Sequence, residues 1–144
     1  MFRKVLLCYD GSAEGRRALR QGADIAITMK AEAFLLAICR SLPECYVPEG
    51  VTPYFLNERE SRARALLDDG VAWLRDRGVS AEGALVEGDA IPQIAQTASR
   101  IGADLIVVGH RARGPLARWW SSSDEESLLE QVNCSVLAAV ADDL

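Results

Sequence analysis

The alternation of apolar runs with amphipathic segments constrains the fold of this chain more than any other feature of its sequence. Short, largely apolar runs, typical of strands covered on both faces, occur at residues 4–10, 31–39, 103–109 and 134–140. Residues 80–88 form a weaker candidate strand, in which apolar and polar residues alternate only partly. Asp-Gly-Ser follows the first run and predicts a turn, with Ser12 as the N-cap of a helix.

The segments between these runs have helical periodicity. One face of the first helix is predicted to carry Ala18, Leu19, Gly22, Ile25, Ala26 and Met29. A second helix is expected at residues 57–77, ended by Gly78, with an inner face of Ala63, Leu66, Leu67, Trp73 and Leu74. A third is expected from Pro92 to about Arg100, ended by Gly102, and a fourth near residues 123–132. Residues 40–55 hold three prolines without a clear period and are interpreted as a long connection.

Strands that alternate with helices predict a parallel sheet with helices on both faces, joined by right-handed crossovers. The chain has 144 residues, the length of one ordinary domain, and we expect residues 1–144 to form a single α/β domain. Its net charge of −5 argues against a nucleic-acid partner. No apolar run approaches the roughly 20 residues of a membrane span, so we expect no membrane partner. The first residues resemble a strand more than a signal peptide, which favours a cytoplasmic location.

Few residue types offer metal or redox chemistry. The cysteines are Cys8, Cys39, Cys45 and Cys134, and they show no Cys-x-x-Cys spacing. His110 is the one histidine of the sequence. The spacing therefore predicts neither a metal site nor a structural disulfide.

A ligand site is predicted where the first and fourth strands end. In open α/β sheets, ligands bind beyond the carboxyl ends of the strands, at the point where strand order reverses. If these two strands are neighbours, Asp10 and Gly109 face one crevice, with a carboxylate for a ribose or an adenine amine and a glycine for close approach. Ser122 and Ser123 precede a helix and could hold an anion or simply cap that helix. Arg111 lies on the same loop, either as an anion ligand or as a solvated side chain.

No catalytic constellation is visible in the sequence. It has no nucleophile elbow, no Walker loop with its lysine and no pair of acids at the spacing of a hydrolase. The sequence therefore favours a function other than catalysis.

Three stretches together give the chain a family resemblance. "KVLLCYDGSAEGRRAL", "VEGDAIPQIAQTA" and "GADLIVVGHRARGPLARWWSSS…CSVLAAV" resemble the universal stress protein family over essentially the whole length. The resemblance implies a Rossmann-like, five-stranded parallel sheet of order 3-2-1-4-5, which makes the first and fourth strands neighbours. It also implies a homodimer paired through the last strand, from Cys134 to Val140. Asp10 matches the nucleotide-facing aspartate of the family, and Ile38 matches the position whose backbone meets the base.

The nucleotide motif of the family is only partly present. The ATP-binding branch has glycine, two residues, glycine, nine residues, then glycine and a serine or threonine. On this chain the three glycine positions are Gly109, Ala112 and Ser122, and the hydroxyl position is Ser123. Asp124 and Glu125 occupy the next two positions, which are commonly valine and serine. Only the first glycine and the last hydroxyl match.

Two functions follow from the resemblance. One is a dimeric stress-response or regulatory module that acts through contacts with a protein partner and binds ATP weakly or not at all. The other is a nucleotide-dependent module that binds ATP or AMP, with magnesium only alongside the nucleotide and with at most slow hydrolysis. The altered motif favours the first.

Overall fold

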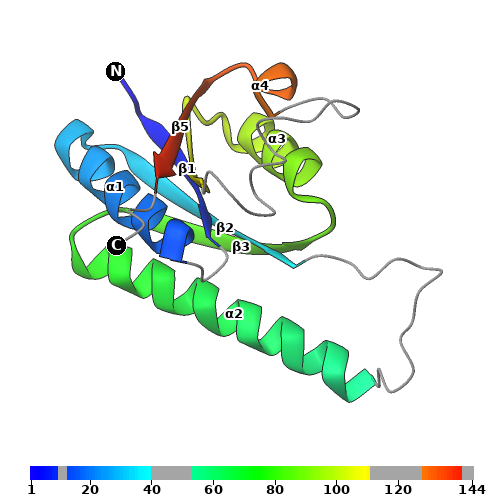
Figure 1. The fold of residues 1–144 in the computed structure, drawn as a ribbon. Helices are drawn as coiled ribbons and strands as arrows, with labels where there is room; N and C mark the ends of the chain where they lie inside the picture. Colours follow the sequence, from blue (N-terminus) through cyan, green and yellow to red (C-terminus); the bar gives the residue numbers. More distant parts are fainter. Residues whose placement is uncertain (10–12, 40–52, 111–127, 141–144) are drawn as a thin grey trace.

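The computed structural model describes residues 1–9, 13–39, 53–110 and 128–140, which form a sheet with helices on both faces (Figure 1). The strands are β1 (Lys4–Tyr9), β2 (Glu32–Cys39), β3 (Ala81–Glu87), β4 (Leu105–His110) and β5 (Ser135–Val140). The helices are α1 (Ala13–Met29), α2 (Pro53–Asp76), α3 (Ala90–Ile101) and α4 (Leu128–Gln131). All strand pairs are parallel, in the order β3-β2-β1-β4-β5, which confirms the predicted α/β class and strand order.

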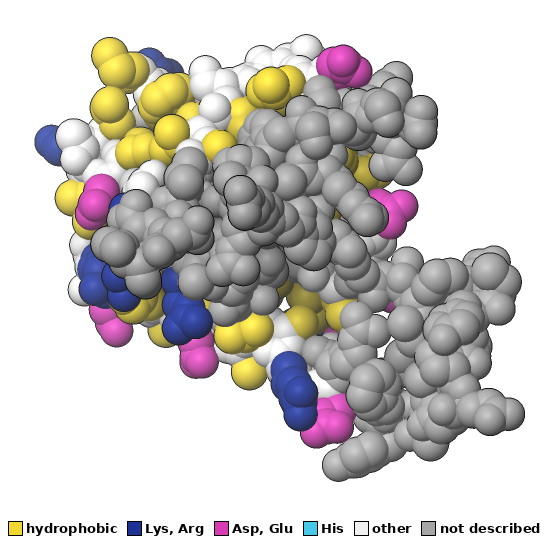
Figure 2. All heavy atoms as spheres, in the orientation of Figure 1, with side chains coloured by type: hydrophobic (Ala, Val, Ile, Leu, Met, Phe, Trp, Pro, Cys, Tyr) yellow, Lys and Arg dark blue, Asp and Glu magenta, His cyan; other side chains and the backbone are white. Residues whose placement is uncertain are grey.

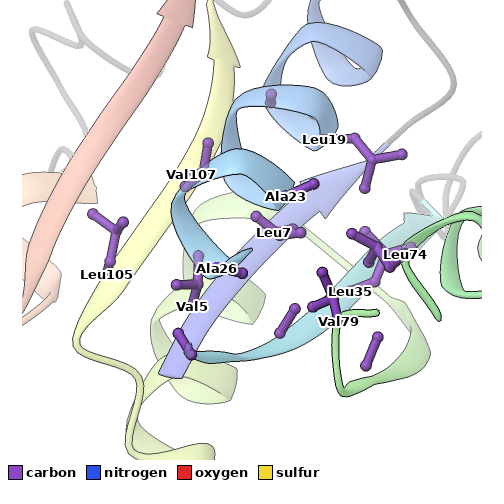
Figure 3. Close-up of a cluster of buried hydrophobic side chains, with 14 of the residues drawn as sticks. Val5, Leu7, Leu19, Ala23, Ala26, Leu35, Leu74, Val79, Leu105 and Val107 are labelled. Atoms are coloured by element: carbon purple, nitrogen blue, oxygen red, sulfur yellow. The ribbon is translucent and has the colours of Figure 1, made fainter. Parts of the chain in front are cut away.

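Each face of the sheet has its own hydrophobic cluster, because alternate side chains of a strand point to opposite faces. Val5 and Leu7 of β1 join the cluster under α1 and α2, whereas Leu6 and Cys8 join the cluster under α3 and α4. Figure 3 shows the first cluster, in which strand residues meet Ala23 and Ala26 of α1 and Leu74 of α2. Burial on both faces explains why the central strands are continuously apolar.

Two glycines bring α1 and α2 close to the sheet. A Cβ at Gly22 would collide with the side chain of Leu7, and a Cβ at Gly70 would lie 2.5 Å from Leu35 Cδ2. A glycine inside a helix costs roughly 1 kcal/mol relative to alanine. Close packing of each helix against a buried leucine offsets that cost.

The helix ends follow the predicted chemistry. Gly78 comes shortly after α2 and has a φ of 81°. Gly102 follows α3 in the left-handed conformation, and its N–H is donated to Ala98 and Ser99 carbonyls. Positive φ is easily adopted only by glycine, so both residues stop their helices as expected.

Some details of the predicted helices were wrong. The α2 helix begins at Pro53, so residues 53–55 belong to it and not to the connection, because proline fits the first turn of a helix. Leu66 is 37% exposed, since Leu67, Gly70 and Leu74 form the stripe that faces the sheet. Met29 is 38% exposed at the end of α1, while Ala23, absent from the predicted face, is buried.

Some predictions fall outside the described residues. These are the proposed N-cap Ser12, residues 40–52 of the predicted connection and residues 123–127 of the predicted fourth helix.

None of the helices in the described ranges is long and apolar enough to cross a membrane.

Candidate functional site

The predicted crevice lies where the strand order of the sheet reverses. The chain leaves β1 toward β2 and β3 on one side and returns to β4 and β5 on the other, so β1 pairs with both β2 and β4. In the second pairing, Val5, Leu6 and Leu7 lie opposite Leu105, Ile106 and Val107. This adjacency confirms that the first and fourth strands end side by side, which is the condition for a shared ligand crevice.

Ile38 and Gly109 are the two predicted site residues that the structure describes. Gly109 is a buried residue of β4 and pairs with Ala139 of β5. Ile38 is a half-buried residue near the end of β2, pairs with Val86 and packs against the cluster under α3 and α4. They lie on the two strands that flank β1, each one residue before its strand ends. The predicted site residues Asp10, Arg111, Ser122 and Ser123 lie outside the described residues, as do Ala112, Asp124 and Glu125.

Two helix N-termini lie at the same edge of the sheet. The α1 and α3 helices begin three or four residues after β1 and β3 end, so their first turns lie beside the carboxyl ends of the strands. Asp89 precedes α3 with an extended backbone, and its carboxylate makes no capping hydrogen bond. The Gly88 N–H donates to the Cys39 carbonyl at 3.0 Å, which ties the ends of β2 and β3 together. Helix N-termini carry partial positive charge, so this edge favours an anion.

The amino ends of the strands have a different chemistry. The Asp104 carboxylate accepts hydrogen bonds from the Arg3 N–H at 2.7 Å and the Lys4 N–H at 3.1 Å. Burial, and secondarily the negative charge of Asp104, raises the pKa of the Cys134 thiol. Cys134 is thus held in its thiol form, which is a poor nucleophile and a poor metal ligand. Within the described ranges, no group of three or more His, Cys, Asp and Glu side chains is arranged to hold a metal ion.

A hollow that the sequence did not predict lies between α1 and α2, and we call it the α1–α2 hollow. Its lining side chains are Tyr9, Arg16, Leu19, Arg20, Asp69 and Trp73. Arg16 and Arg20 are one helical turn apart, and this i, i+4 pair was the available signal in the sequence. Trp73, predicted as an inner-face residue, is only half-buried and lines this hollow.

The match to known proteins extends over nearly all of the chain. The profile of the universal stress protein family matches residues 1–139. The chain belongs to this family. Universal stress protein YxiE of Bacillus subtilis is 28% identical over 145 residues, an alignment that covers 95% of this chain and 98% of the relative.

Solved structures of universal stress proteins have the same fold. A family member from Burkholderia pseudomallei is 26% identical with a TM-score of 0.75, over 95% of each chain. A family protein of Arabidopsis thaliana, solved with AMP bound, is 18% identical with a TM-score of 0.70, over 98% of this chain and 93% of the other. Below 25% identity this second likeness concerns the fold alone.

Proposed function

We propose that this universal stress protein is a dimeric regulatory module that acts through protein contacts and binds ATP weakly or not at all. The loop after β4 carries the proposal. Of the family's three glycine positions, only Gly109 is a glycine, while Ala112 and Ser122 add side chains where the backbone would approach phosphate. Side chains at these positions also disfavour positive φ.

Acidic residues after the loop strengthen the proposal. Asp124 and Glu125 directly follow Ser122 and Ser123, the pair of hydroxyls that would seat a phosphate. Like charges about 4 Å apart repel by roughly 1 kcal/mol in water and about 4 kcal/mol at an effective dielectric of 20. Since each 1.4 kcal/mol is a factor of ten in affinity, two such repulsions lower ATP affinity by about an order of magnitude or more.

The dimer is proposed to form through β5. This strand is at an edge of the sheet, and its sequence SVLAAV carries no charge. Uncharged, unpaired edges favour the addition of another strand. A twofold axis would repeat the same residues on both subunits, Val136, Leu137 and Val140 among them.

The second candidate function is binding of ATP or AMP, with magnesium only alongside the nucleotide. Three observations favour it: the AMP-bound relative of the same fold, the helix N-termini beside the crevice, and the arginines of the loop. Arg111, Arg113 and Arg118 would neutralise part of the repulsion from Asp124 and Glu125. Ile38 and Asp10 would then meet the base and ribose, and hydrolysis would be slow at most.

The proposed cellular setting follows from charge and family. We propose a cytoplasmic location without a membrane partner. The net charge of −5 argues against a nucleic-acid partner. Its protein partner would be recognised by a surface of the dimer.

Calorimetry with ATP and magnesium tests the choice between the two functions. The wild type is compared with a variant that restores the family motif by Ala112→Gly, Ser122→Gly, Asp124→Val and Glu125→Ser. We expect weak or undetectable binding by the wild type and at least tenfold tighter binding by the variant. Tight binding by the wild type, or no gain in the variant, contradicts the proposal and favours the nucleotide-binding alternative.

A further inference from the structure

We propose that the α1–α2 hollow binds a small aromatic zwitterion, a ligand of the aromatic α-amino acid class. This inference goes beyond the proposed function. That function depends on the loop after β4 and on the edge strand β5, whereas the hollow lies between α1 and α2 on one face of the sheet. It has a volume of about 180 Å³. Pockets for drug-sized ligands usually measure about 300–1,000 Å³, so this hollow suits a molecule with one ring and a short polar part.

The apolar wall of the hollow comes from three elements. Tyr9 is the last residue of β1, Leu19 lies on α1 and Trp73 lies on α2. Tyr9 and Trp73 are half-buried residues whose side chains line the hollow. A Cβ at Gly70 would lie 3.6 Å from Tyr9 Cδ1, which shows that α2 passes close to the tyrosine ring. A planar apolar group placed here would be flanked by aromatic side chains.

The charged side chains of the hollow have no partner within the described part of the chain. Arg16, Arg20 and Asp69 are exposed, and no hydrogen bond or ion pair joins any of them to another described residue.

The arginines on α2 and directly after it differ in this respect. Arg62 and Arg64 pair with Glu58 and Glu60, at 3.3 and 4.0 Å. Arg75 donates to the Ala81 carbonyl at 3.0 Å, and the guanidinium of Arg77 lies 3.6 Å from the centre of the Trp73 ring. These four arginines therefore have partners, whereas Arg16 and Arg20 on α1 have none among the described residues.

The signs of these charges indicate the class of ligand. Two guanidinium groups one helical turn apart suit a carboxylate, which accepts several charge-assisted hydrogen bonds. Asp69 would accept from an ammonium group and would repel a ligand that carries only negative charge. In Figure 2, Lys and Arg side chains gather where α1 meets the carboxyl-terminal half of α2, with Asp and Glu side chains beside them. A zwitterion with an aromatic ring uses all of these groups.

Three probes separate the contributions of the ligand's charges. The protein is labelled with ¹⁵N-tryptophan, and the indole signal of Trp73, assigned with a Trp73→Phe variant, is followed by NMR during titration. L-phenylalanine carries both charges, 3-phenylpropionate lacks the ammonium group and 2-phenylethylamine lacks the carboxylate. We expect L-phenylalanine to bind with a millimolar or lower Kd and the other two probes at least about tenfold more weakly.

Substitutions assign each charge to its residue. The double variant Arg16→Gln/Arg20→Gln should weaken L-phenylalanine at least about tenfold. Asp69→Asn should weaken L-phenylalanine but leave 3-phenylpropionate unchanged or tighter. Asp68→Asn is the matched control for Asp69, because Asp68 borders a different hollow beside Gly83. Arg64→Gln is the control for arginine charge.

The substitutions that change a charge are all at exposed positions, so the fold should be retained, and circular dichroism checks it. The proposal is overturned if L-phenylalanine causes no saturable shift of the Trp73 indole. It is equally overturned if the three probes bind alike, or if the control variants weaken binding as much as those in the hollow.

Discussion

The two edge strands of the sheet differ in how they meet solvent. On β3, Glu82 and Glu87 are exposed, and the Arg75 side chain donates a hydrogen bond to the carbonyl of Ala81, the first residue of the strand. On β5, the sequence SVLAAV has no charged residue. Edge strands are commonly protected against pairing with other chains by charged side chains. The comparison indicates that β3 is protected and that β5 is the edge suited to self-association.

Both edge strands are also packed against helices. Gly83 of β3 allows α2 to pack closely, with Leu67 and Val71 against the strand. On the other side, Leu137 and Ala139 of β5 join the cluster under α1. Val86 of β3 and Val136 of β5 pack against the cluster on the other face of the sheet. Both strands are therefore anchored to the core, and the difference between them lies in the charge of their exposed side chains.

The largest effect is expected from a charge in the middle of β5. Ala138 of β5 and Ala84 of β3 are a matched pair, since both are half-buried. Ala138 pairs with Val108 and Ala84 pairs with Leu36, and both partners are buried in the cluster under α3 and α4. Ala138→Lys should raise the dimer Kd by about a hundredfold or more, because like charges across an interface cost several kcal/mol. Ala84→Lys should leave the dimer intact. Sedimentation equilibrium measures both, and equal effects would show that β5 is not the pairing edge.

The next effect concerns the stability of the β3 side. A Cβ at Gly83 would lie 2.8 Å from both Leu67 Cδ1 and Val71 Cγ2, so Gly83→Ala should lower the free energy of unfolding by about 1–3 kcal/mol. Glu82→Ala, at the exposed neighbouring position, should change it by less than about 0.5 kcal/mol. Urea denaturation at one fixed protein concentration makes the comparison. A Gly83→Ala variant as stable as the wild type would mean that α2 is not closely packed there.

Removal of the charges on β3 should have a smaller effect. Glu82→Thr/Glu87→Thr leaves the edge uncharged and should increase concentration-dependent association, detected by static light scattering. The control Asp24→Asn/Glu130→Gln changes net charge equally at exposed helical positions. If the control associates as strongly, net charge and not edge protection keeps β3 unpaired.

The smallest effect concerns Cys134, which directly precedes β5. Burial and the Asp104 charge raise the pKa of this thiol, so less of it is thiolate at a given pH, and alkylation should rise at a higher pH than for an ordinary cysteine. Asp104→Asn should speed alkylation by iodoacetamide at pH 8 a few-fold.

Pairing through β5 adds a second expectation for the same thiol. Alkylation of Cys134 should slow as protein concentration rises, whereas alkylation of Cys39, which pairs with Glu87 of β3, should not. Mass spectrometry of the two cysteine peptides reports both rates, and a Cys134 rate independent of concentration would count against pairing at β5.

The element order was predictable because each central strand is a short apolar run. A strand buried on both faces must be apolar throughout, and residues 103–109 show this directly. The stops at Gly78 and Gly102 were predictable because few other residues adopt positive φ. The strand order came from the family resemblance, since alternation alone does not specify which parallel strands are neighbours.

The details that failed depend on contacts between elements. Leu66 and Leu67 both fit an apolar face, and only the approach of α2 at Gly70 decides which of them is buried. The α1–α2 hollow combines Tyr9, Arg16 and Trp73 from three different elements, so the local pair Arg16 and Arg20 does not by itself predict which residues complete it. Of the predicted crevice, the adjacency of β1 and β4 is confirmed, while the roles of Asp10, Arg111, Ser122 and Ser123 stay predictions.

Native mass spectrometry of the purified protein tests the central claim most directly, because one spectrum reports both the assembly and any retained nucleotide. The account predicts a species of twice the 15.7 kDa chain mass without bound nucleotide. Ala138→Lys should convert it to the single-chain mass. A dimer that carries one ATP or AMP per chain, or a wild-type monomer at micromolar concentration, would contradict the account.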